Sequence, residues 1–347
     1  MNLADLNNVA LAMVTPGKGL LAADESSGTI KKRFDAIKVE STEDSRRDYR
    51  EMLFRSHEAM SKYISGVILY DETIWQNAKD GTPLVKLIEQ AGAIPGIKVD
   101  EGTQALPNCP GELVTVGLDK LAERLAKYYE RGARFAKWRA VIDIGSGTGG
   151  SRSIPTMTAI RVNAHALARY AALCQAAQIV PIVEPEVLMD GDHDIDRCYE
   201  VTQRVLNRTF QELRVQRVAL EGMILKPNMA ISGKKCAKQA SVQEVAEKTV
   251  RLLKSCVPAA VPGIAFLSGG QDDEEATAHL DAMNKIGNLP WPLTFSYGRA
   301  LQAAPQKAWS GKADNVAAGQ RAFSHRARMN GLASTGNWDA GLEKQAA

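Results

Sequence analysis

The chain has 347 residues, of which 45% are hydrophobic, and a formal net charge of +3. This length and apolar content suffice for one large core or two smaller ones. The charge is too small to indicate nucleic-acid binding, which would need a basic stripe that does not stand out here.

The cysteines and the N-terminus indicate the compartment. The five cysteines are odd in number, and no CxxC or CxxH spacing occurs among them. A disulfide framework or a zinc knuckle is therefore not expected, and a reducing, cytoplasmic environment is predicted. Asp5 precedes the first cation, Lys18, which is the reverse of a signal peptide. No uncharged apolar run is long enough to span a bilayer, so no membrane partner is expected.

Short apolar, β-rich runs recur along the chain and predict eight strands. Their ranges are 19–26, 65–70, 94–100, 135–142, 180–187, 222–229, 263–270 and 291–298. Segments with helical spacing lie between them, such as LDKLAERLAKYYERG and AIRVNAHALARYAALCQAA. This alternation implies parallel strands joined by crossover helices. Eight evenly spaced units favour an α/β fold of the (β/α)₈ TIM-barrel type over an open doubly wound sheet.

The chain is expected to hold one domain, because no Pro-rich or low-complexity linker divides it. We expect a single barrel over residues 1–310 with an N-terminal helical extension. Residues 311–347 are expected to form a C-terminal tail.

Charged side chains occur in the last half of five predicted strands, and within each strand they share one face because strand side chains alternate. The sets are Asp24 with Ser26, Lys98 with Asp100, Lys137 with Arg139, Glu184 with Glu186, and Lys226 with Asn228. A single residue of this kind would be read as a strand-end charge that reaches solvent. Five sets together predict one pocket at the carboxyl ends of the strands, where barrel enzymes keep their catalytic groups. Cations and anions nearly balance, which makes their burial tolerable.

Two glycine-containing turns follow the last two strands. Ser268, Gly269 and Gly270 precede a helix with an acidic first turn, and Gly298 and Arg299 begin another helix. Backbone N–H groups at such turns bind phosphate, and glycine allows a close approach. Barrel phosphate sites often use the loops after strands 7 and 8, so these turns predict a phosphate site rather than ordinary turns.

Taken together, these stretches resemble the class I, Schiff-base type of fructose-1,6-bisphosphate aldolase. The matching stretches, in the family's order from about residue 2 to about residue 330, are AADES with KKRF, GIKVD, FAKWRAV, IVEPEVLMDGDHD, LKPNM, FLSGGQ and SYGRALQ. The resemblance implies aldol cleavage of fructose 1,6-bisphosphate to dihydroxyacetone phosphate and glyceraldehyde 3-phosphate, and the reverse condensation. It also implies sugar-phosphate partners, no cofactor, no metal, and a homo-oligomer with a tetramer favoured.

The resemblance also implies roles for the charged residues. Lys226 would form the Schiff base, Glu184 would act as the acid and base, and Lys137 would be the neighbouring cation. Glu186 and Asp24 would orient Lys226 and stabilise developing charge. An attacking amine must be neutral, and both burial and a nearby cation favour the neutral form.

Phosphate contacts follow from the same resemblance. The phosphate of the ketone half would be held by Ser268, Gly269, Gly298 and Arg299. The second phosphate would be held by Ser26, Arg33 and Lys98, with Arg139 assisting. Two phosphate monoesters carry about −3 to −4 near neutral pH, which suits this cationic lining.

The chain departs from the family in two places. Animal members end in a mobile arm whose terminal tyrosine helps proton exchange, whereas this chain ends GLEKQAA and its last tyrosine is Tyr297. The Gly/Ser-rich loop over residues 145–156 is also longer.

Two motifs in the sequence suggest other chemistry. Gly145, Gly147 and Gly150 match the spacing of a dinucleotide fingerprint, but no acidic residue follows until Glu184. His193 lies among carboxylates in DGDHD, but metal-dependent aldolases need several histidine ligands, so a helix-capping loop is expected instead. Two other functions stay open at this point: another lysine-dependent sugar-phosphate enzyme such as a transaldolase, and a non-catalytic phosphosugar-binding barrel.

Overall fold

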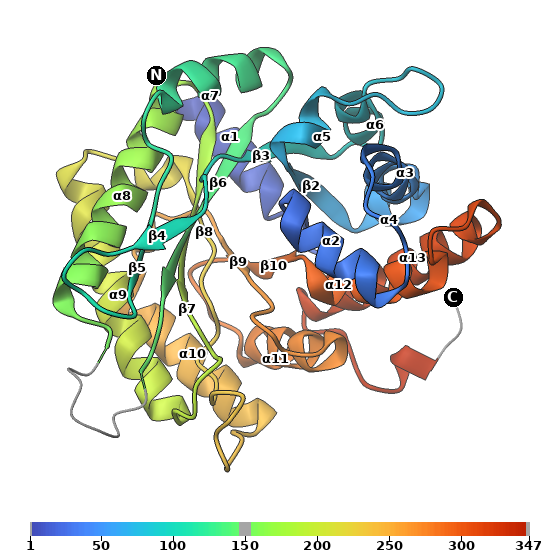
Figure 1. Ribbon diagram of the computed structural model, residues 1–347. Coiled ribbons are helices and arrows are strands. Elements are labelled where there is room, and N and C mark those ends of the chain that lie inside the picture. The colour runs from blue at the N-terminus through green and yellow to red at the C-terminus, as the bar shows by residue number, and fades with distance from the viewer. Residues whose placement is uncertain (1, 146–153, 345–347) are drawn as a thin grey trace.

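A computed structural model describes residues 2–145 and 154–344, and it shows a closed barrel of parallel strands (Figure 1). The order around the barrel is β1, β10, β9, β8, β7, β6, β3, β2. The strand bounds are β1 Gly19–Ala23, β2 Ile64–Leu69, β3 Ile94–Lys98, β6 Phe135–Ile142, β7 Val180–Val187, β8 Ile224–Leu225, β9 Ile264–Phe266 and β10 Leu293–Tyr297. Each falls within or beside a predicted range, so the predicted (β/α)₈ TIM barrel is confirmed.

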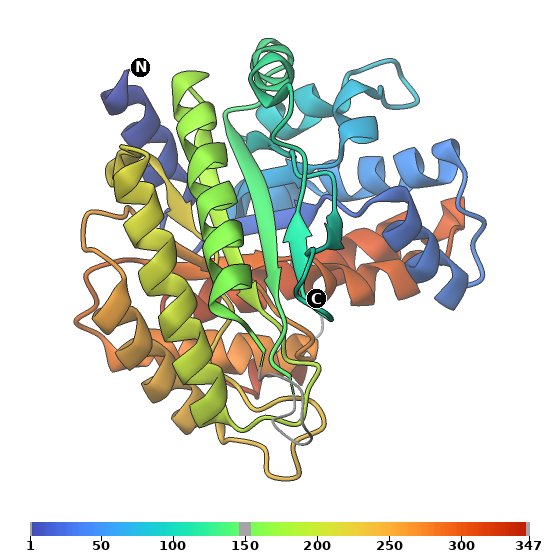
Figure 2. The same ribbon diagram turned by 60° about the vertical axis from the view of Figure 1, so that its left-hand side comes forward.

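Helices surround the barrel and cover its outer face (Figure 1). Their bounds are α1 Leu3–Met13, α2 Ser27–Ala36, α3 Glu43–Phe54, α4 His57–Lys62, α5 Asp71–Trp75, α6 Leu84–Gln90, α7 Leu121–Glu130, α8 Met157–Ala176, α9 Ile195–Val215, α10 Val242–Cys256, α11 Asp273–Ile286, α12 Arg299–Trp309 and α13 Val316–Ala333. Figure 2 shows α8 and α9 running side by side along one flank, where they cover β6 and β7. The Trp138 ring of β6 stacks on Tyr170 of α8, with ring centroids 5.6 Å apart.

Apolar residues fill the amino-terminal end of the barrel. The cluster joins the barrel interior to helix α1 and contains Leu6, Ala10, Met13, Leu20, Ala22, Ile68, Phe135, Ile182, Ile224 and Ala265. The Phe135 ring fits because β3 carries glycine beside it: a Cβ on Gly96 would lie 2.2 Å from that ring. With this end closed by α1, the charged residues that follow the strands are left at the carboxyl end.

Two features of the structure lie outside the predicted alternation of strands and helices. A short antiparallel hairpin of β4 (Thr103–Ala105) and β5 (Leu113–Thr115) is inserted between β3 and α7. Helix α13 packs against α11 and α12 and buries Phe323, Ala327 and Met329. The division between a barrel over residues 1–310 and a tail over 311–347 stays a prediction.

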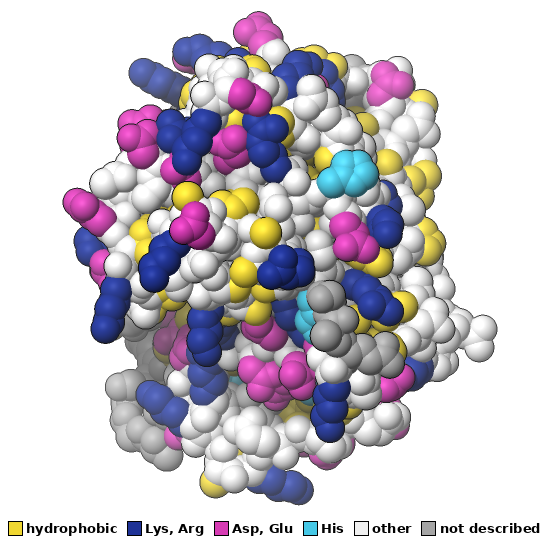
Figure 3. Space-filling model, turned by 90° about the vertical axis from the view of Figure 1, so that its right-hand side faces the viewer, with side chains coloured by type: hydrophobic (Ala, Val, Ile, Leu, Met, Phe, Trp, Pro, Cys, Tyr) yellow, Lys and Arg dark blue, Asp and Glu magenta, His cyan; other side chains and the backbone are white. Residues whose placement is uncertain are grey.

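The surface shows mixed charge. On the face in Figure 3, Lys and Arg side chains are interspersed with Asp and Glu. Within residues 2–145 and 154–344, no helix is long and apolar enough to cross a membrane. Gly147 and Gly150 of the dinucleotide-like motif lie outside the described residues.

Candidate active site

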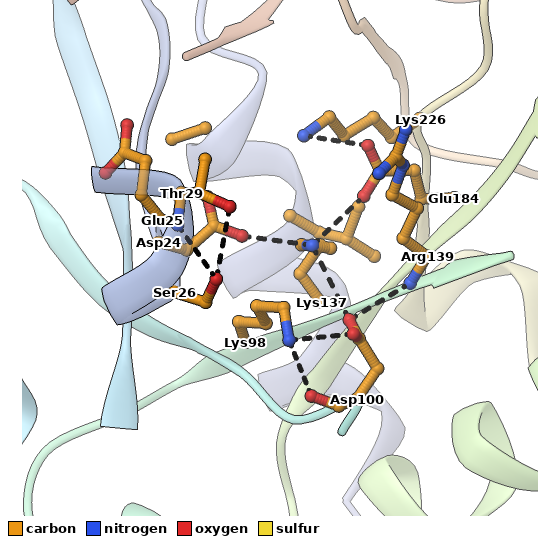
Figure 4. Close-up of polar contacts among 12 residues, drawn as sticks. Asp24, Glu25, Ser26, Thr29, Lys98, Asp100, Lys137, Arg139, Glu184 and Lys226 are labelled. Carbon is orange, nitrogen blue, oxygen red and sulfur yellow. Dashed lines mark hydrogen bonds and ion pairs between the residues drawn. The ribbon is translucent and has the colours of Figure 1, made fainter. Parts of the chain in front are cut away.

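Charged side chains converge at the carboxyl end of the barrel (Figure 4). The strand register explains part of this arrangement. Lys98 of β3 is aligned with Lys137 of β6, and Arg139 of β6 is aligned with Glu184 of β7. Since parallel strands present their carboxyl ends at the same edge, residues distant in sequence meet there.

Lys226 directly follows β8, and its side chain is buried. Its Nζ lies 3.1 Å from Glu184 Oε1, and its backbone N–H donates to Val183 O at 2.8 Å. The next residues hold this position. Asn228 Oδ1 accepts from the backbone N–H of Val187 at 3.0 Å, which ties the loop after β8 to β7. Lys226 is therefore held against a carboxylate, and both side chains are buried.

Lys137 is the cation at the centre of the cluster. Its Nζ lies 3.0 Å from Asp24 Oδ2, 3.4 Å from Glu184 Oε2 and 3.6 Å from Asp100 Oδ2. Burial alone would lower the pKa of Lys137, but the charges of Asp24, Glu184 and Asp100 outweigh it and raise the pKa above its ordinary value. Lys137 therefore stays protonated, and it shares the Glu184 carboxylate with Lys226.

Asp24 and Asp100 stay ionised for the complementary reason. Burial raises the pKa of Asp24, but the charges of Lys137 and Lys226 outweigh it and bring the pKa to about 2. For Asp100, Lys137 and Lys98 likewise lower the pKa against the effect of burial. Lys98 Nζ lies 2.7 Å from Asp100 Oδ1. Sequence reasoning placed Asp100 on the correct face but assigned it no role.

Glu186 was expected to orient Lys226, but its ion pair is with another residue. It pairs with Arg139 Nε, while Asp24 pairs with Lys137. Burial lowers the pKa of Arg139, and the charge and hydrogen bond of Glu186 raise it above its ordinary value. Among the ion pairs of the described residues, Lys226 has one carboxylate partner, Glu184.

The loop after β1 gathers a second group of charges. Ser26 caps α2, accepting from the backbone N–H of Thr29 at 3.4 Å. Arg33 Nη1 lies 2.5 Å from Glu25 Oε1, and Arg50 of α3, 1% exposed, donates to the Glu25 backbone carbonyl at 3.0 Å. No spacing pattern marked Glu25 or Arg50, and Arg50 reaches the site from helix α3 rather than from a barrel strand.

The predicted phosphate turns lie near one another. Gly269 and Gly270 have φ of +48° and +82°, and a Cβ on Gly269 would lie 2.4 Å from Met189 Cε. Glycine is needed there for both backbone and space. Arg299 Nη2 donates to the Gln271 backbone carbonyl at 3.1 Å. A Cβ on Gly298 would lie 3.6 Å from Arg33 Nη2, so Arg33 also reaches this side of the site.

The DGDHD stretch forms a helix start. Asp194 Oδ1 accepts from the backbone N–H of Arg197 at 2.8 Å and caps α9, which confirms the predicted capping loop. In the part of the chain that the structure describes, no group of three or more His, Cys, Asp and Glu residues is placed to hold a metal ion.

Comparisons with known proteins agree with this geometry. The family model of fructose-bisphosphate aldolase class-I matches residues 5–347. A probable fructose-bisphosphate aldolase class 1 of Xanthomonas campestris is 58% identical, over 97% of this chain and 99% of its own length. A cytosolic fructose-bisphosphate aldolase 4 of Arabidopsis thaliana is 52% identical, over 93% of this chain and 81% of its own length.

A solved structure supports the same assignment. The fructose-bisphosphate aldolase of Plasmodium falciparum, crystallised with TRAP and a small-molecule inhibitor, superposes with a TM-score of 0.95 at 48% identity. The match covers 98% of this chain and 96% of that one. Neither the transaldolase nor the non-catalytic alternative agrees with these relatives. The resemblance seen in the motifs is thus confirmed, and the chain belongs to the class-I fructose-bisphosphate aldolase family.

Proposed function

We propose that Lys226 carries the aldolase activity of this chain, as the amine that forms a Schiff base with the ketone carbon of fructose 1,6-bisphosphate. The observation that carries the proposal is the buried contact between Lys226 Nζ and Glu184 Oε1, at 3.1 Å. The other carboxylate oxygen, Glu184 Oε2, is buried and has no hydrogen-bond partner among the described residues. Lys137 Nζ lies 3.4 Å from this oxygen as an ion-pair partner. A carboxylate with one oxygen on the amine and the other free of hydrogen bonds can exchange protons with both the amine and a substrate.

The reaction then proceeds through an iminium and an enamine. Glu184 takes a proton from Lys226, the neutral amine adds to the ketone carbon, and a proton moves from the new ammonium nitrogen to the alkoxide oxygen to make a hydroxyl. Glu184 returns a proton to the new hydroxyl, water leaves, and a cationic iminium forms. Glu184 next takes the proton of the substrate hydroxyl two carbons away, the carbon–carbon bond breaks, and its electron pair moves into the iminium to give an enamine. The aldehyde leaves, and protonation of the enamine followed by hydrolysis frees dihydroxyacetone phosphate.

Lys137 would act by electrostatics. It stays protonated between Asp24, Asp100 and Glu184, so the site keeps a fixed positive charge there. It also stabilises negative charge as it develops on the substrate oxygen. Glu186, through its pair with Arg139, would orient that guanidinium rather than Lys226.

The phosphates would be held at two places. Ser268, Gly269, Gly298 and Arg299 would hold the phosphate of the ketone half. Ser26, Arg33 and Lys98 would hold the second phosphate with help from Arg139. The ion pairs of Arg33 with Glu25 and of Lys98 with Asp100 support this proposal, because they keep both cations at the mouth of the site before substrate arrives.

We also propose that the enzyme works in the cytoplasm as a homo-oligomer, with a tetramer favoured. The cytosolic name of the Arabidopsis relative supports the compartment, and the family resemblance supports the assembly. Sedimentation of the purified chain gives the subunit number directly, and a monomer at micromolar concentration would contradict the assembly.

Borohydride trapping tests the central assignment. Reduction in the presence of dihydroxyacetone phosphate should modify one lysine, and peptide mapping should place the adduct on Lys226. Lys226→Ala should abolish both the adduct and the cleavage of fructose 1,6-bisphosphate. An adduct on Lys98 or Lys137 would overturn the assignment. Activity should survive EDTA, since the iminium serves as the electron sink.

A further inference from the structure

Gln271 joins two parts of the proposed phosphate site, the Ser268 turn and Arg299. Its side-chain Nε2 donates to Ser268 O at 2.8 Å, and its backbone N–H donates to the same carbonyl at 3.0 Å. Its own backbone carbonyl accepts from Arg299 Nη2 at 3.1 Å. The position of Gln271 therefore affects both the Ser268 turn and the Arg299 guanidinium.

His279, two turns into helix α11, fixes the orientation of the Gln271 amide. Its Nδ1 lies 2.5 Å from Gln271 Oε1, and the residue is 3% exposed. Because Gln271 Nε2 faces the Ser268 carbonyl, its Oε1 must face the imidazole, so His279 Nδ1 carries the proton. Burial lowers the pKa of His279 to about 4. The ring is therefore neutral at physiological pH and donates this one bond without adding charge to the site.

The Ser268 turn needs such support from hydrogen bonds. Gly269 and Gly270 both have positive φ, a conformation that glycine leaves at low cost because it has many others available. Packing against the turn is incomplete, because a pocket lies beside it. Its lining includes Met189, Lys234, Gln271 and His279. The bonds from His279 through Gln271 to Ser268 hold the turn where packing is incomplete.

We propose that His279 is a positioning residue for the phosphate of the ketone half, acting through Gln271 on the Ser268 turn and on Arg299. This inference rests on the proposed phosphate role of Ser268, Gly269 and Arg299. Within residues 2–145 and 154–344, no hydrogen bond joins His279 to Lys226 or Glu184. Its loss should therefore weaken substrate binding and leave the bond-breaking step nearly unchanged.

Steady-state kinetics of His279→Leu tests the inference with two substrates. Both fructose 1,6-bisphosphate and fructose 1-phosphate carry the phosphate of the ketone half. We expect KM to rise about tenfold for each, while kcat stays within about threefold. His279→Asn keeps an N–H donor close to the position of Nδ1 and should keep KM within about threefold of the wild type.

Two further variants make the test specific. Leu280→Ala weakens the same helix from a fully buried neighbour that lies outside the hydrogen-bonded chain, and it should leave KM unchanged. Gln271→Met removes the amide at the other end of the same bond and should reproduce the KM increase, even if His279→Leu does not fold.

The outcomes separate this inference from the proposed function. Unchanged KM in His279→Leu and Gln271→Met, beside a raised KM in Arg299→Ala, would overturn the inference alone. Equal KM increases in His279→Leu, His279→Asn and Leu280→Ala would overturn it too, because they would show a general effect of a weakened helix. Unchanged KM in Arg299→Ala as well would mean that the proposed phosphate site itself is wrong.

Discussion

Glu184 Oε1 lies 3.1 Å from Lys226 Nζ, inside the carboxyl end of the barrel. The contact joins Glu184 of β7 to the residue that directly follows β8, and Lys226 also continues the β7–β8 ladder by donating its backbone N–H to Val183 O. The hydrogen bond from the Lys226 backbone N–H to Val183 O thus fixes the position of Lys226 along β7, beside Glu184. Proton transfer between the two groups needs no movement of the main chain.

Replacing Glu184 with Gln should remove this proton transfer while keeping the shape of the side chain. We expect kcat for cleavage to fall by about 10²–10⁴-fold, the usual contribution of a positioned acid or base. KM should change little, because the phosphate contacts lie elsewhere. Stopped-flow cleavage assays measure kcat, and the rate of borohydride-sensitive adduct formation reports the earlier step.

Glu186→Gln is the matched control for that variant. It makes the same change two residues away on the same face of β7, at a carboxylate paired with Arg139 rather than Lys226. Its kcat should fall much less than that of Glu184→Gln. If the two variants lose activity equally, Glu184 has no special place in the proton transfers.

The barrel could be predicted because its strands are short, apolar and evenly spaced, and because parallel strands bring their carboxyl ends together. The β4–β5 hairpin could not be predicted, since Thr103–Ala105 is exposed and lacks an apolar face. Helix α13 could not be predicted from the sequence for a different reason. Its register buries polar Arg326 and Asn330 with the apolar residues, which weakens the apolar stripe.

Sequence patterns predicted the parts of the site whose geometry follows from strand alternation. They did not predict the parts whose geometry depends on tertiary contacts. Lys137, Glu184 and Lys226 meet because their strands are neighbours in the barrel. Which cation pairs with which carboxylate depends on side-chain reach, so the pairing of Glu186 with Arg139 could not be read from spacing. Arg50 comes from α3, and only the folded chain brings it to Glu25.

The two ends of the substrate should respond to different cations. Arg299→Ala should raise KM for both fructose 1,6-bisphosphate and fructose 1-phosphate, because Arg299 lies beside the turn proposed for the shared phosphate. Lys98→Ala should raise KM mainly for the bisphosphate. Parallel assays with the two substrates measure this difference. Equal effects of both variants on both substrates would mean that the phosphate ends are assigned wrongly.

Asp24 should make stability depend on pH in the acid range. The pKa of Asp24 in the folded chain is about 2, against an ordinary value of 3.8 for this carboxyl group. A carboxyl group whose folded pKa is lowered stabilises the protein above its unfolded pKa and loses this effect as pH falls toward the folded pKa. Ionised Asp24 therefore contributes roughly 2–3 kcal/mol to the free energy of unfolding, from about 1.4 kcal/mol per pKa unit.

Urea unfolding of the wild type and Asp24→Asn should show that dependence. The difference in free energy of unfolding should stay constant between about pH 5 and pH 8, and shrink below about pH 4. A difference that instead shrinks between pH 8 and pH 6 would show that another group, and not the Asp24 carboxyl, controls it.

The C-terminal segment should not supply the proton to the enamine. One of its two carboxylates, Asp339, is exposed. The other, Glu343, already accepts from Arg326 Nη1 at 2.7 Å, His325 Nε2 at 2.9 Å and Trp338 Nε1 at 3.0 Å. Burial raises the pKa of Glu343, but the hydrogen bonds and charge of Arg326 outweigh it, helped by the bonds from His325 and Trp338, and hold the pKa below its ordinary value. Glu343 is therefore ionised and engaged in holding the segment on α13.

Truncation after Gly336 tests whether the C-terminal segment stabilises the fold or takes part in proton transfer. It leaves α13 intact to Ala333 and removes Trp338 and Glu343. The rate of C–H exchange on dihydroxyacetone phosphate should stay within about threefold, which is under about 1 kcal/mol of barrier. Stability should fall by about 1–3 kcal/mol, since the buried Arg326 loses its carboxylate partner. Glu343→Gln in the full chain controls for lost packing and should also keep the exchange rate. A hundredfold slower exchange in a truncated enzyme that is still folded would show that this segment does take part in proton transfer.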